Sequence, residues 1–81
     1  MKVIAKNGID IFNKPNGKKI GHYDKGNVIR TVELENKKPA KDGKVYVKYT
    51  VGGSFLGLKK NWVVYEDENG KKNLEKDYGS D

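Results

Sequence analysis

The chain has 81 residues, no cysteine and a net charge of +6. This length fits one small domain with a limited core, and the lack of cysteine excludes disulfides and thiolate metal sites. No apolar run approaches the roughly 20 residues that cross a bilayer or forms a secretory signal, so we expect no membrane contact. We expect a cytoplasmic protein if the chain is complete, and a cell-wall or extracellular one if it is excised from a larger secreted protein.

Short extended segments alternate with turn residues in the first part of the chain. Their apolar and polar residues predict strands over residues 2–5, 9–12, 18–23 and 28–34. Asn7-Gly8, a proline-containing loop over residues 13–17 and a turn over residues 24–27 separate these strands. Because no segment has a convincing helical spacing of apolar residues, the pattern predicts an all-β fold.

Residues 44–62 are the stretch around which the predicted fold is organised. Apolar residues alternate with polar ones from Val45 to Val51, which predicts a half-buried strand. Gly52-Gly53 predicts a tight hairpin turn, with residues 54–58 running back as the partner strand. Period-two burial predicts that the core includes Ile11, Ile20, Val28, Val32, Val47, Tyr49 and Val51.

Charge and composition change near the C-terminus. Residues 1–65 hold 14 Lys and Arg against five Asp and Glu, whereas residues 66–81 hold three against six. We therefore predict a domain over residues 1–69 and a flexible polar tail over residues 70–81, with the acidic excess carried by residues 66–81. Leu74 and Tyr78 offer that tail little apolar surface, so we expect it to be loosely held and dispensable for folding.

Between residues 9 and 65, several different short motifs follow one another along the chain. They are Ile9-Asp10-Ile11, Asn13-Lys14-Pro15-Asn16-Gly17, Ile20-Gly21, Asp24-Lys25-Gly26, Val28-Ile29, Val45 to Gly53 and Trp62-Val63. In this order and spacing the chain resembles the bacterial SH3 (SH3b) family. The family's Gly-Trp is replaced by Phe55-Leu56-Gly57-Leu58, and the Arg that often precedes its Pro loop is replaced by the Phe12-Asn13 region. The resemblance implies a small SH3-like barrel of five to six short antiparallel strands.

The sequence offers no catalytic arrangement. His22 is the single histidine, which excludes a paired-histidine metal site within one chain, and we read it as a solvent-facing strand residue. Ser54 and Ser80 lack a neighbouring motif that would activate a nucleophile, and the glycines do not form a phosphate-binding loop. We expect neither enzymatic activity nor a bound cofactor or metal.

Exposed aromatic residues near lysines are the best candidates for a binding surface. Tyr46 shares a strand face with Lys44 and Lys48, so we expect it to be exposed. An SH3-like barrel would bring this residue near its first loop and its closing strand. The predicted site therefore consists of Phe12, Asn13, Lys14, Tyr46 and Trp62, with rings that supply contact area and lysines that steer approach.

Three functions fit these residues. The first is a monomeric SH3-like binding module for a peptide or protein surface, whose ligand would be peptidoglycan or its stem peptide if the chain follows the SH3b family. The second is a free-standing intracellular bacterial or phage protein that binds and modulates a host protein. The third is weak, non-specific nucleic-acid binding through the lysine-rich face. Arg30 is the single arginine among 17 cations, so nucleic-acid recognition is possible but not favoured.

Overall fold

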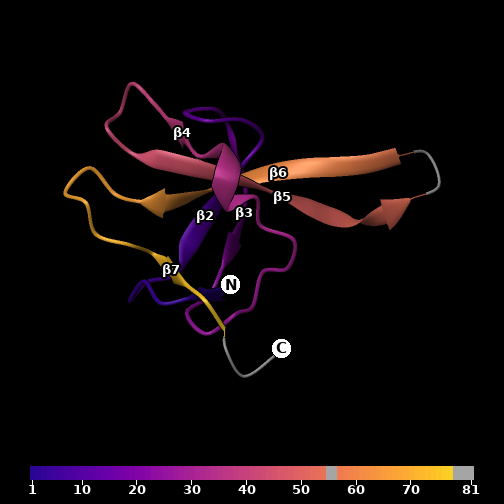
Figure 1. Ribbon diagram of the computed structural model, residues 1–81, viewed down its shortest axis with the longest axis horizontal. Coiled ribbons are helices and arrows are strands. Elements are labelled where there is room, and N and C mark those ends of the chain that lie inside the picture. The colour runs from indigo at the N-terminus through magenta and orange to yellow at the C-terminus, as the bar shows by residue number, and fades with distance from the viewer. Residues whose placement is uncertain (55–56, 78–81) are drawn as a thin grey trace.

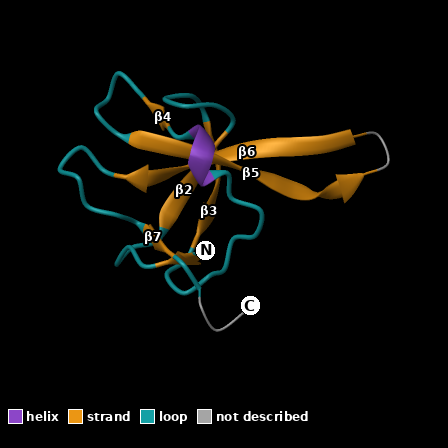
Figure 2. Cartoon of the chain, in the orientation of Figure 1, coloured by secondary structure: helices purple, strands orange, loops and turns teal. Residues whose placement is uncertain are grey.

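The computed structural model describes residues 1–54 and 57–77, and these are almost entirely strands and loops (Figures 1 and 2). They form seven strands and one short 3-10 helix: β1 (Lys2–Val3), β2 (Ile9–Phe12), β3 (Lys19–Tyr23), η1 (Leu34–Asn36), β4 (Lys38–Pro39), β5 (Val45–Ser54), β6 (Gly57–Glu66) and β7 (Leu74–Glu75). The predicted all-β fold is confirmed. No helix in the described residues is long and apolar enough to cross a membrane.

The strands form two antiparallel sheets. The larger has the order β3-β2-β6-β5-β4, and the smaller pairs β1 with β7. Within the described residues, β3 and β4 are open edges of the larger sheet. The sheets therefore do not close into the predicted barrel, although the small antiparallel all-β domain is as expected.

The β5–β6 hairpin is the longest element and projects from the body of the domain (Figure 1). Its pairing joins Val47 to Val63 and Lys48 to Trp62, and it continues to Ser54 opposite Gly57. Gly52 and Gly53 lie inside β5, so the predicted turn at these two residues is wrong. The residues between Ser54 and Gly57 lie outside the described part of the chain.

The core lies on one face of this hairpin. Its buried members are Val3, Ile9, Ile29, Val47, Tyr49, Val63, Tyr65 and Leu74. Of the predicted core, Val47 and Tyr49 are buried, while Ile11, Val32 and Val51 are partly buried and pack against the cluster. The predicted burial of Ile20 and Val28 is wrong, because each is 43% exposed.

The segment over residues 28–34 is irregular rather than the predicted strand. It contributes only isolated bridges, at Val28 and Val32, in the described chain. Ile29, 2% exposed, occupies the core in place of Val28. Thr31 has a φ of 56°, which is rare for a β-branched residue. This left-handed conformation interrupts the extended backbone, so the segment cannot continue as a strand.

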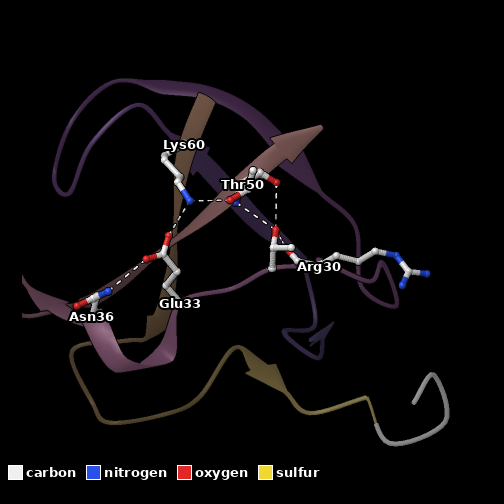
Figure 3. A network of polar contacts seen from close by, with 6 residues as sticks. Arg30, Glu33, Asn36, Thr50 and Lys60 are labelled. Carbon is white, nitrogen blue, oxygen red and sulfur yellow. Dashed lines mark hydrogen bonds and ion pairs between the residues drawn. The ribbon is translucent and has the colours of Figure 1, made fainter. Parts of the chain in front are cut away.

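Polar contacts hold this irregular segment against the hairpin (Figure 3). The Thr31 hydroxyl accepts a hydrogen bond of 3.3 Å from the Thr50 N–H, and so takes the place of a strand partner. The Glu33 carboxylate accepts hydrogen bonds from Lys60 Nζ at 2.9 Å and Asn36 Nδ2 at 3.2 Å. Lys60 also donates to the Thr50 hydroxyl at 2.7 Å, so one cation connects both strands of the hairpin to the segment.

The C-terminal part of the described chain is docked. Leu74 is 1% exposed and pairs with Val3, and the Asn73 N–H donates to the Tyr65 carbonyl at 2.9 Å. The expectation that this stretch is loosely held is therefore wrong for β7, because pairing with β1 supplies the burial that its own composition lacks. Tyr78 lies outside the described residues, and independent folding of residues 1–69 stays a prediction.

Val47→Asp should abolish cooperative folding. Val47 is 0% exposed, and an unpaired buried charge costs several kcal/mol, which is about the whole stability of a small domain. Thermal unfolding followed by circular dichroism measures this. Ile20→Asp is the matched control, since Ile20 is a strand residue on the surface and should melt close to wild type. A cooperative, near-native melt of Val47→Asp would contradict the observed core.

Leu74→Ala should destabilise the domain by about 2–5 kcal/mol, the usual cost of truncating a fully buried leucine. Denaturant unfolding of the full chain measures the change, with Lys76→Ala as an exposed control in the same segment. A stability loss no larger than that of the control would show that β7 does not contribute to the core in solution.

Candidate functional site

Four side chains form a row across the outer face of the larger sheet, the face opposite the core. The strand pairings place Lys19 opposite Phe12, Phe12 opposite Trp62, and Trp62 opposite Lys48. Residues directly opposite one another in a sheet project to the same side. Lys48 Nζ lies 5.9 Å from the centroid of the Trp62 ring, a cation–π distance. Phe12 and Trp62 are both half-buried, so the row combines aromatic surface with positive charge.

Tyr46 lies on this same face but is covered. It is 2% exposed, and its ring packs edge-on against Phe12 with centroids 5.7 Å apart. The prediction of an exposed Tyr46 is therefore wrong. The strand alternation gave the correct face, but loops from elsewhere in the chain fold over that position.

The Tyr46 hydroxyl connects two of these loops. It donates a hydrogen bond of 2.7 Å to Asp42 Oδ2 and also interacts with the backbone N–H of Asn16. Burial, with a smaller effect of Asp42, raises the pKa of Tyr46 to about 12. The pKa of Asp42 is lowered, first by the Lys44 N–H and then by Tyr46. Tyr46 thus stays neutral and Asp42 charged across the physiological range.

An open groove of about 410 Å³ lies between the two loops. One wall is Lys14, Pro15 and Asn16, and the other is Pro39, Ala40 and Lys41. None of these lining residues carries a carboxylate, and the nearby Asp42 is engaged by the Tyr46 hydroxyl and the Lys44 N–H. The proline rings restrict the backbone of both walls.

The first wall has a fixed conformation. The Asn13 N–H donates to the Lys18 carbonyl at 3.1 Å, and Asn13 Oδ1 accepts from the Lys18 N–H at 3.0 Å. The Gly17 N–H closes a turn on the Lys14 carbonyl at 3.0 Å. A Cβ at Gly17 would lie only 2.4 Å from Lys14 Cγ, so this position excludes larger residues. Asn13 therefore shapes the loop in which Lys14 is presented.

The structure brings the five predicted site residues onto one face in two arrangements. Phe12 and Trp62 lie side by side in the sheet, whereas Asn13 and Lys14 belong to the loop above Tyr46. Sequence reasoning missed Lys48 and the whole second wall. The place of Lys48 beside Trp62 depends on the register of the hairpin. The wrong turn prediction at Gly52-Gly53 gave the hairpin a different register. The second wall lay in a stretch read only as a polar loop, and its single proline and single alanine offered no periodicity.

Elsewhere on the surface, Asp10, Lys19 and His22 form a small exposed cluster of titratable side chains. Asp10 Oδ1 lies 2.8 Å from His22 Nδ1 and 3.3 Å from Lys19 Nζ. These contacts, the His22 hydrogen bond first, lower the pKa of Asp10. No group of three or more His, Cys, Asp or Glu within residues 1–54 and 57–77 could hold a metal ion.

Comparisons of this chain with protein-family models, with curated proteins and with solved structures found no match.

Tyr46→Phe should reduce the loss of stability at high pH. The folded-state pKa of Tyr46 is raised above its ordinary value of 10.0 to about 12, so its contribution is complete below pH 10 and is lost as pH rises toward 12. The variant should also lose about 0.5–1.5 kcal/mol at neutral pH with the hydroxyl's hydrogen bond. Denaturant unfolding at pH 7, 10 and 11 measures both effects. Tyr65→Phe is a control, since Tyr65 takes no part in the Tyr46–Asp42 contact, and a pH dependence of Tyr46→Phe equal to that of wild type would contradict the assignment.

Proposed function

We propose that this protein is a non-enzymatic, SH3-like binding module that recognises an extended acidic peptide segment of a partner. The observation that carries the proposal is the groove between two proline-containing loops, with Lys14 and Lys41 on opposite walls and no carboxylate in its lining. An extended peptide fits such a groove because the groove is open and lies between two loops. The lysines attract carboxylates and steer their approach.

The walls are pre-organised, which favours binding. Tyr46 is anchored by burial and joins both loops beneath the groove. A rigid site loses less conformational entropy when it binds than a flexible one does. Phe12 extends this support to the sheet, where it packs on Tyr46 and pairs with Trp62.

Two sources of peptide fit this chemistry. The SH3b resemblance implies the stem peptide of peptidoglycan. An acidic loop of an intracellular protein fits the same lysine-lined groove, and would make the protein a modulator of that partner.

Lys14→Glu combined with Lys41→Glu should weaken peptide binding at least tenfold. The probe is a fluorescently labelled ten-residue peptide of alternating Glu and Pro, titrated by anisotropy, and pelleting with purified peptidoglycan tests the wall source separately. Lys6→Glu combined with Lys25→Glu is the matched control, since it makes the same charge change at exposed turn positions outside the groove. Equal weakening by both double variants, or no binding of either probe by wild type, would contradict the proposal.

Nucleic-acid binding, the competing function, should be weak and strongly dependent on salt. Sixteen of the 17 cations are lysines, which neutralise phosphate without reading base edges. Titration of duplex and single-stranded DNA at 50 and 200 mM salt measures this. Sequence-preferring binding that persists at 200 mM salt would overturn the expectation and favour a nucleic-acid function for the Phe12–Trp62 row.

A further inference from the structure

A second groove lies where the irregular segment meets β5. It has a volume of about 250 Å³ and is lined by Tyr23, Val28, Ile29, Arg30, Tyr49, Thr50 and Val51. Tyr49 and Val51 pack toward the core, and Tyr49 is part of it. None of its lining residues belongs to the lysine-lined groove described above.

The lining of this second groove is mostly apolar and contains one cation. The lining contains aliphatic and aromatic side chains, a threonine, and Arg30, but no carboxylate. Val28 is 43% exposed, which is high for a large apolar residue. Arg30 takes part in no ion pair among the described residues, and its side chain extends away from the Thr31–Thr50 contacts (Figure 3). A guanidinium presents a planar fork that matches a carboxylate.

The backbone around Arg30 is fixed. Thr31 holds a positive φ and contacts the Thr50 backbone, and Glu33 is fastened by Lys60 and Asn36. The residue that presents the cation and the strand that forms the opposite wall are therefore joined beside the groove. Beyond Thr50, no described residue outside the hairpin pairs with the outer edge of β5. An open strand edge can pair with an added extended peptide.

The dimensions indicate what fits. A volume of about 250 Å³ is below the roughly 300–1,000 Å³ of small-molecule sites, so it has room for one or two side chains and not for a cofactor. Val28 and Arg30 both line the groove, which therefore offers an apolar contact and a cation to the same ligand. In a C-terminal residue the side chain and the carboxylate leave the same Cα, so one aliphatic residue can make both contacts. A chain terminus that ends in an aliphatic residue supplies both groups.

We propose that this groove binds the C-terminus of a partner protein whose last residue is aliphatic. That side chain lies against Val28, Ile29 and Val51, the terminal carboxylate pairs with Arg30, and the preceding residues extend along the free edge of β5. The site is independent of the lysine-lined groove, because the two share no residue.

The test is a nuclear magnetic resonance titration with the peptide acetyl-Ser-Gly-Ser-Val-Leu bearing a free carboxylate. Its shifts should map to the residues that line this groove. The C-terminal amide of the same peptide, and a peptide in which the Leu is replaced by Ser, should each bind about tenfold more weakly or worse, since each loses either the charge-assisted contact or the apolar one. Arg30→Gln should lower the affinity of the acid to that of the amide.

Lys14→Glu combined with Lys41→Glu serves as the second control. It should leave the affinity for this peptide unchanged while it lowers the affinity for the Glu-Pro probe. The proposals for the two grooves can therefore be contradicted separately. Equal affinity of acid and amide, unchanged affinity in Arg30→Gln, shifts that map elsewhere, or no shifts at millimolar peptide would each overturn the proposal.

Discussion

The direct pairing of Val47 with Val63 in the β5–β6 hairpin is the constraint on which the rest of the fold depends. Both residues are 0% exposed, so they fix which face of the hairpin is covered by the core. Because side chains alternate along a strand, the same register places Lys48 and Trp62 together on the opposite face. A slip of one residue would expose the valines and bury the lysine. Core stability and the composition of the outer face therefore follow from one register.

Alternation predicted the faces of β5 correctly, but it could not predict exposure on the outer one. Val47 and Tyr49 are buried as expected, whereas Tyr46 is covered by loops and not by a sheet. Loop paths depend on turn geometry, caps and distant partners such as Asp42, and none of these has a period in the sequence. The gathering of Phe12 and Trp62 depended on strand order, which alternation does not contain either. The family resemblance was the only sequence signal for it.

The errors share a physical cause. Residues 28–34 carry apolar side chains on both faces, so their pattern could not tell Val28 from Ile29, and Thr31 leaves the extended region altogether. Leu74 is a single apolar residue in a polar stretch, where one residue cannot show a period. Its burial comes from pairing with β1, about 70 positions earlier in the chain. Gly52-Gly53 fits a turn by local chemistry, but the longer pairing of the hairpin overrides it.

The distribution of carboxylates leaves the cations of both grooves available to a ligand. Of the five acids in residues 1–65, Asp10 contacts Lys19, Glu33 contacts Lys60, and Asp42 accepts from Tyr46 and the Lys44 N–H. These contacts use the acids beside the sheet to position side chains, and they occupy Lys19 and Lys60. No ion pair in the described chain involves Lys14, Lys41 or Arg30. Both grooves are therefore lined by cations that the fold leaves without a charged partner, so an incoming carboxylate has no internal ion pair to displace. Ion pairs in the described chain involve only Lys19, Lys60 and Lys72 among the lysines and arginine, so Lys14, Lys41 and Arg30 are set apart by their position in the grooves.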